Sequence, residues 1–110
     1  MNIDILSDQQ NKLLTVRITG NLISTSVDSI RADIEKCLTV SAGQSPPWRT
    51  FQLDLSSSTM VDSVGLNFIV TLFKTVQKLG GKMQLLYKNP NVHRTLLFTR
   101  MDRFIELIQA

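Results

Sequence analysis

The 110-residue sequence has one cysteine, one histidine and no long run of apolar residues. Its single cysteine cannot form a disulfide within the chain, which agrees with a reducing compartment. No stretch approaches the roughly 20 apolar residues that a membrane-spanning helix needs. The opening MNIDILSDQQ lacks the basic start and the apolar block of a secretory signal. We therefore expect a cytoplasmic protein that does not insert into a membrane.

Residues that commonly carry catalysis or hold metals are also scarce. No spacing of Cys, His, Asp and Glu matches a metal site. Asp62, Ser63 and His93 could be written as a Ser-His-Asp set, but an adjacent Asp and Ser on one turn cannot both orient one imidazole. We interpret His93 as a solvent-facing residue and Cys37 as a small core residue. The sequence thus predicts no enzyme, no metal and no cofactor.

The charged residues are divided unevenly along the chain. The formal net charge is +3, but residues 1–73 carry five Lys/Arg and seven Asp/Glu, whereas residues 74–110 carry seven and two. The two parts are therefore −2 and +5. A basic segment can attract nucleic acid, anionic lipid or an acidic protein. Because these cations are spread out and no aromatic residues alternate with them, we expect a solvated surface and no nucleic-acid binding.

The amino-terminal half has the pattern of a hairpin followed by a helix. Residues 12–19 alternate apolar and polar side chains, as a half-buried strand does, and residues 2–7 can pair with them across the polar SDQQN turn. From Ser24 the apolar spacing changes to three and four, which predicts a helix with Ser24 or Ser26 as its N-cap. SAGQSPPW, residues 41–48, is expected to be a surface loop.

The carboxyl-terminal half alternates strands and helices. FQLDL at 51–55 and KMQLLY at 82–87 are expected strands, and the apolar stripe that begins at Ser63 predicts a helix ending at Gly80-Gly81. Asn89-Pro90 supplies an N-cap and a first-turn proline for a short helix near 90–99. The tail RFIELI could be a last strand or a short helix. The alternation predicts a single α/β domain over residues 1–110 with parallel strand pairing.

The corner TMVDSVGL places an acid and a hydroxyl where a strand passes into this helix. The first amides of a helix lack internal partners and its dipole makes that end partly positive, so Asp62 or Ser63 can cap it. Either residue alone would suffice for capping. The pair therefore also raises the possibility of a functional site.

These segments resemble the STAS domain, specifically the stand-alone anti-sigma factor antagonists of bacteria. The resemblance rests on a strand ending in Asp-Leu-Ser at 54–56, on Val-Asp-Ser-Val-Gly-Leu at 61–66, and on VRITGNL at 16–22. It implies a STAS-like sandwich. In such a fold a mixed sheet of four to five strands is packed mainly on one face with three to four helices.

The resemblance also implies a phosphorylation switch in a partner-switching pathway that regulates transcription. The unphosphorylated form would bind an anti-sigma factor that is also a serine kinase of the GHKL ATPase type. Phosphorylation at Ser63 would release it, and a PP2C-type phosphatase would restore it. Gly65 would let a partner backbone approach. The residues expected to contact the partner are Asn21, Ser24, Asp54, Asp62, Ser63, Val64, Gly65 and Asn67.

The sequence departs from the family pattern near the switch. Asn21 and Ile23 stand where many relatives have acidic residues, and the family's final helix is expected to be missing or much reduced. One of the nearby hydroxyls at 56–59 could be modified in place of Ser63. The alternative function is an unphosphorylated STAS adaptor of an ABC transporter or a larger signalling assembly. We expect a monomer or weak dimer.

Overall fold

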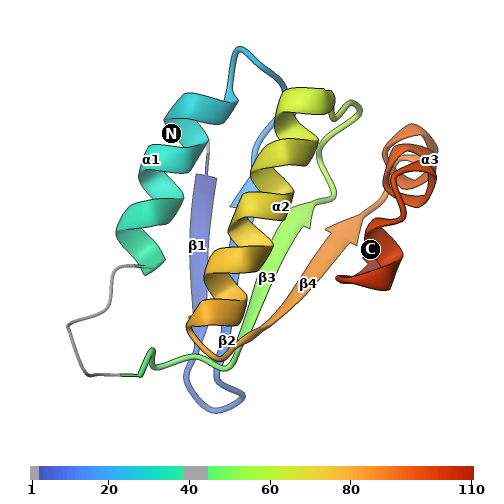
Figure 1. Ribbon diagram of the computed structural model, residues 1–110. Coiled ribbons are helices and arrows are strands. Elements are labelled where there is room, and N and C mark those ends of the chain that lie inside the picture. Colours follow the sequence, from blue (N-terminus) through green and yellow to red (C-terminus); the bar gives the residue numbers. More distant parts are fainter. Residues whose placement is uncertain (1–2, 39–44) are drawn as a thin grey trace.

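The computed structural model describes residues 3–38 and 45–110. It is one α/β domain with two helices side by side in front of a twisted sheet (Figure 1). In chain order the elements are β1 (Ile3–Asp8), β2 (Leu13–Ile18), α1 (Val27–Leu38), β3 (Thr50–Leu55), α2 (Ser63–Lys78), β4 (Lys82–Tyr87), α3 (Pro90–Phe98), the 3₁₀ helix η1 (Met101–Arg103) and β5 (Glu106–Gln109).

The sheet is mixed and has the strand order β1-β2-β3-β4-β5. β1 pairs antiparallel with β2, as the predicted hairpin requires, with Ile5 opposite Val16. The other neighbours pair in parallel, and α1, α2 and α3 serve as the connections between them. This architecture confirms the predicted α/β class with a mixed sheet and helices packed mainly on one face.

The core lies between the sheet and the two long helices. Strand alternation turns Phe51, Leu53 and Leu55 toward the helices, and all three are fully buried. Residues spaced at three and four along the helices meet them from the other side, as the sequence predicts: Val27, Ile30, Ile34 and Leu38 of α1, and Phe68, Ile69, Leu72 and Val76 of α2. This packing holds the two helices against the sheet.

The opposite face of the sheet carries polar side chains that bond to one another across strands. Gln52 accepts from the Thr15 hydroxyl at 3.0 Å and donates to Gln84 at 3.0 Å. Gln84 in turn donates to Glu106 at 2.8 Å. The alternation of FQLDL therefore separates an apolar face from a hydrogen-bonded polar face.

Asp54 belongs to this polar face. Its carboxylate accepts from Arg17 Nε at 3.0 Å and from the Ser56 amide at 2.9 Å, and only 4% of the residue is exposed. Burial works to raise its pKa, but the hydrogen bonds from Ser56 and the Arg17 guanidinium outweigh burial and hold the pKa below its usual value. Asp54 is therefore ionised and paired in the folded protein.

We expect Asp54→Asn to lower the free energy of unfolding by about 1–2 kcal/mol at neutral pH. The folded pKa lies below the unfolded value of about 3.9, so the ionised carboxylate stabilises the fold above that pH. This stabilisation is lost as the pH falls through the folded pKa. Denaturant unfolding of both proteins from neutral to acidic pH should show the difference shrinking, whereas a constant difference would contradict this assignment.

Several sequence predictions are refined or overturned at single residues. Cys37 is half-buried against the core, and burial followed by the nearby Asp33 raises the pKa of its thiol. The prediction that His93 faces solvent is wrong, because its ring is half-buried and stacks on Tyr87 with centroids 4.3 Å apart. The first four residues of the expected 41–48 loop lie outside the described residues.

The tail RFIELI, which the sequence left open, forms a turn and then a strand. Ile105 is buried, and β5 pairs in parallel with β4 through Leu107 opposite Leu85. Within residues 3–38 and 45–110, no helix is long and apolar enough to cross a membrane.

Candidate functional site

The site forms where β3 passes into α2, at the carboxyl end of the parallel strands. Asp62 is the N-cap in an extended conformation, and α2 begins at Ser63. Ser63 is therefore the first helical residue, and it is exposed. Its hydroxyl makes no hydrogen bond to any residue that the structure describes. The predicted helix start is confirmed, and Asp62, not Ser63, does the capping.

The Asp62 carboxylate ties two loops together. One oxygen accepts from the Gly65 amide at 2.8 Å, and the other accepts from the Ser24 amide at 2.8 Å. These bonds, from Gly65 first and from Ser24 second, hold the pKa of Asp62 below its usual range. Ser63 thus stands beside a carboxylate that is ionised at neutral pH.

The loop before α1 and the loop before α2 are joined along their backbones at Leu22. The Leu22 amide donates to the Met60 carbonyl, and the Asp62 amide donates to the Leu22 carbonyl, each at 3.3 Å. Leu22 also forms a parallel β-bridge with Val61. Leu22 and Val61 are both buried. The start of α2 is therefore fixed by a neighbour about 40 residues away in the sequence.

Asn21 fixes the second loop through its side chain. Its Oδ1 accepts from the amides of Thr59 at 2.8 Å and Met60 at 3.2 Å, and from the Thr59 hydroxyl at 3.2 Å. This side chain therefore holds the loop that precedes Asp62. Its observed contacts are within the chain, so its predicted contact with a partner stays a prediction.

Gly65 is buried, and the structure gives a different reason for a glycine than the one expected. A Cβ at this position would lie 2.2 Å from the carbonyl oxygen of Leu22. The backbone that lies against Gly65 is thus that of Leu22 in the same chain. A side chain here would separate α2 from the loop that carries Asn21 and Ser24.

Exposed apolar and polar side chains lie close to Ser63 in the chain. Met60 is 55% exposed and Val64 is 40% exposed, both unusually high for such side chains. Asn67 lies one turn beyond Ser63 on the same side of α2 and is also exposed. We name Met60, Ser63, Val64 and Asn67 the Ser63 surface. It combines exposed apolar side chains with a hydroxyl that forms no hydrogen bond to the described residues.

Asp54 does not join this group. It lies on the sheet face opposite the helices, where Arg17 and Ser56 already occupy its carboxylate. Ser24, in contrast, is exposed and is bonded to Asp62 through its amide. Of the residues predicted to contact a partner, the structure therefore gathers seven at the start of α2 and leaves Asp54 apart.

The same geometry supports the exclusion of a catalytic triad. The Asp62 carboxylate is taken by two backbone amides, and His93 stacks on Tyr87. No hydrogen bond joins His93 to Asp62 or Ser63 in the described parts of the chain. Over the same residues, no group of three or more His, Cys, Asp and Glu could hold a metal ion.

The chain is similar in sequence and in fold to known proteins. The chain is 29% identical over 96 residues to the anti-sigma F factor antagonist of Paenibacillus polymyxa, covering 87% of this chain and 78% of that protein. In fold it is similar to an anti-sigma factor antagonist from Mycobacterium paratuberculosis, with a TM-score of 0.74 and 21% identity over 96% of this chain and 84% of that one.

It is also similar in fold to SpoIIAA, an anti-sigma factor antagonist and cell fate determinant of Bacillus. The TM-score is 0.75 for the unphosphorylated form and 0.68 for the phosphorylated form, each at 18% identity over 98% of this chain and 87% or 90% of the other. The family model for the STAS domain matches residues 4–110. The chain therefore belongs to the STAS domain family, with anti-sigma factor antagonists among its relatives.

Proposed function

We propose that this chain is an anti-sigma factor antagonist controlled by phosphorylation at Ser63. The unphosphorylated form binds an anti-sigma factor that is also a serine kinase of the GHKL ATPase type. Phosphorylation of Ser63 releases that partner, and a PP2C-type phosphatase restores binding. The observation that carries the proposal is the exposed, unbonded hydroxyl of Ser63 at the first position of α2.

The neighbouring hydroxyls are less available than that of Ser63. Ser57 donates its hydroxyl to the Ile18 carbonyl at 2.6 Å, and Ser58, which is buried, donates to the Gly20 carbonyl. Thr59 donates to Asn21. A kinase would have to break these bonds, and the loop they hold, before it could modify them. This contrast favours Ser63 as the modified residue.

A phosphoryl group at Ser63 is compatible with the fold. The positive end of the α2 dipole and its unpaired amides favour a negative group at this position. The group adds roughly −1.5 to −2 charges beside the ionised Asp62. No buried side chain has to move, because Ser63 already faces outward. The change therefore acts on the Ser63 surface and not on the core.

The added charge would directly affect the binding of a partner that covers the Ser63 surface. Met60 and Val64 supply apolar area that is favourable to bury. A dianion at Ser63 would have to lose its water when the partner covers it, which is costly without a paired cation. Loss of binding is then the expected result of phosphorylation.

The decisive experiment is phosphorylation of the purified chain by a GHKL-type kinase from the same genome with ATP. We expect mass spectrometry to find one phosphoryl group in the peptide that contains Ser63. Ser63→Ala should remain unmodified, and Ser29→Ala, a matched loss of an exposed hydroxyl on α1, should be modified like the unaltered protein. Phosphate on the 56–59 hydroxyls, or none with every such kinase tested, would contradict the proposal.

A further inference from the structure

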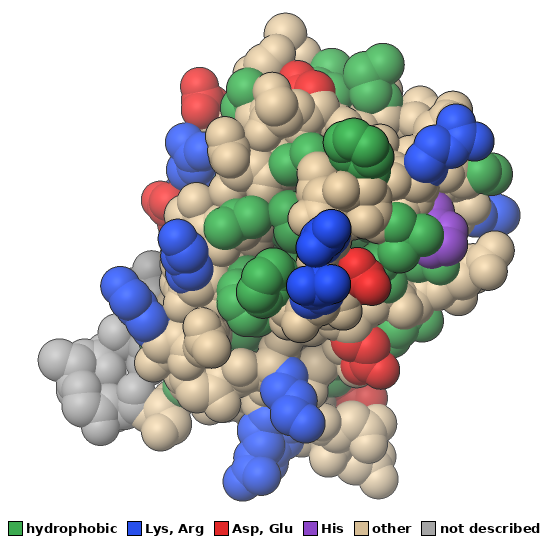
Figure 2. Space-filling model, turned by 45° about the vertical axis from the view of Figure 1, so that its right-hand side comes forward, with side chains coloured by type: hydrophobic (Ala, Val, Ile, Leu, Met, Phe, Trp, Pro, Cys, Tyr) green, Lys and Arg blue, Asp and Glu red, His purple; other side chains and the backbone are tan. Residues whose placement is uncertain are grey.

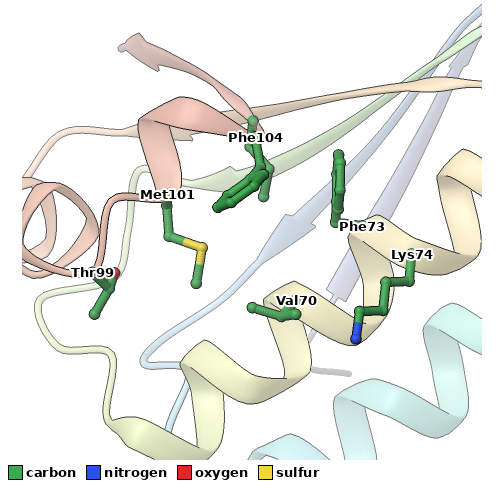
Figure 3. A pocket seen from close by; sticks show the side chains of 7 residues that line it. Val70, Phe73, Lys74, Thr99, Met101 and Phe104 are labelled. Carbon is green, nitrogen blue, oxygen red and sulfur yellow. The ribbon is translucent and has the colours of Figure 1, made fainter.

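A second exposed apolar surface lies between α2 and the turn that follows α3. Here a hollow of about 200 Å³ is lined by Val70, Phe73 and Lys74 of α2 and by Thr99, Met101 and Phe104. Figure 3 shows Val70 and Phe73 on one side and Met101 and Phe104 on the other, across an open space. We name this hollow the α2–η1 groove.

Phe104 gives the groove an exposed aromatic rim. Its ring is tilted against that of Phe73 with centroids 6.2 Å apart, yet Phe104 is 64% exposed. Burying such a ring is favourable, and aromatic side chains commonly dominate binding energy at interfaces. The rim therefore has apolar area that nothing in the described chain covers.

The size of the groove indicates what could occupy it. Sites for whole small molecules measure roughly 300–1,000 Å³, which is larger than this hollow. A hollow of about 200 Å³ fits apolar side chains projecting from a docked segment better. An amphipathic helix offers such side chains at spacings of three, four and seven residues.

The charge around the groove favours an acidic occupant. Lys74 is the one charged residue among those that line it, and no lining residue is acidic. Of the residues next to the lining residues in the chain, Arg100 and Arg103 are basic and Asp102 and Glu106 are acidic. The chain segment from residue 74 onward carries seven Lys/Arg and two Asp/Glu. Figure 2, turned so that the right-hand side of Figure 1 comes forward, shows Lys and Arg, and also Asp and Glu, among hydrophobic side chains.

We infer that the α2–η1 groove binds an acidic amphipathic helical segment of a partner protein, with apolar residues in the hollow and carboxylates near Lys74. The groove begins at Val70, seven residues beyond Ser63 and about 10.5 Å further along α2 on the same side. The inference does not depend on modification of Ser63.

The test uses the full chain and a labelled synthetic peptide of roughly four helical turns. Its Leu residues recur at spacings of three and four, and Glu and Ala fill the other positions. We expect fluorescence anisotropy to show binding on the order of 10 μM. Phe104→Ser and Lys74→Glu should each weaken it about tenfold or more. Lys74→Glu changes only an exposed side chain and serves as the test should Phe104→Ser not fold.

Two matched variants and two matched probes complete the design. Phe98→Ser removes an 87% exposed ring outside the groove, and Lys36→Glu makes the same charge change on α1, so both should bind like the unaltered chain. A peptide with Lys in place of Glu should not bind. The inference would be overturned if the Lys peptide bound as well as the Glu peptide, if Phe98→Ser weakened binding as much as Phe104→Ser, or if the Glu peptide did not bind at all. It would also be overturned if the chain bound anionic phospholipid vesicles through Phe104 but did not bind the peptide.

Discussion

Replacing Ser63 with aspartate is expected to reduce affinity for the anti-sigma factor partner by about 150-fold, equivalent to about 3 kcal/mol. The new carboxylate adds to the ionised Asp62 on a surface whose Met60 and Val64 the partner must cover. The fold should keep its stability, because an acidic residue in the first turn of a helix interacts favourably with the helix dipole. Titration by calorimetry and a thermal melt of the same sample measure both effects.

Two control variants test whether the negative charge at position 63 itself causes the loss of affinity. Ser63→Asn has nearly the same shape as the aspartate but no charge, so it should retain most of the affinity. Ser29→Asp adds the same charge to an exposed serine near the start of α1, away from the Ser63 surface, and should bind normally. An adaptor function without phosphorylation predicts little change for Ser63→Asp, and that result would reject the switch.

The second large effect is expected from Gly65→Ala, which should destabilise the fold by about 2–3 kcal/mol. The added Cβ would lie 2.2 Å from the Leu22 carbonyl oxygen and 3.0 Å from its carbonyl carbon. Alanine favours a helix over glycine by about 1 kcal/mol, which offsets only part of this clash. Because Leu22 is held by backbone bonds to Met60 and Asp62, it cannot move freely aside.

Denaturant unfolding at neutral pH measures this loss. Asn67→Ala, an exposed position on the same helix, is the control and should leave stability within about 0.5 kcal/mol. If Gly65→Ala were as stable as the unaltered chain, the close approach of α2 to Leu22 would be wrong. The positions of Ser24 and Asn21 relative to Asp62 would then be in doubt as well.

The elements whose signals are local could be predicted from the sequence. The stripe from Leu66 to Val76 and the acid before Ser63 predict both the length and the start of α2. Asn89 and Pro90 likewise predict α3, where the Asn89 side chain accepts from the Asn91 amide at 2.8 Å. Capping and helical periodicity depend on residues close together in the chain, so one sequence is enough.

The contacts that build the site connect distant residues and could not be predicted in this way. Nothing near Asn21 indicates that it accepts hydrogen bonds from Thr59 and Met60. The sequence also did not show why residue 65 is a glycine. The reason is the carbonyl group of Leu22, which lies too close to leave room for a side chain. Glycine itself was the available signal, since a glycine inside a helical pattern often marks a close backbone approach.

The tail shows a different limit. RFIELI is too short for its period to separate a strand from a helix. The tail forms a strand because the edge of β4 offers backbone hydrogen-bond partners to residues 106–109. His93 was misassigned for a similar reason, since its stacking partner Tyr87 lies across the turn that joins β4 to α3.

The central claim is that a dianion at Ser63 changes recognition while the architecture persists. Proton–nitrogen correlation spectra of the full chain, before and after complete phosphorylation at Ser63, test it most directly. We predict shifted resonances only at the start of α2 and in the loops at 19–26 and 56–62 that meet it, with the sheet resonances in place. Shifts throughout the sheet and α1, or a collapse of spectral dispersion, would contradict the account.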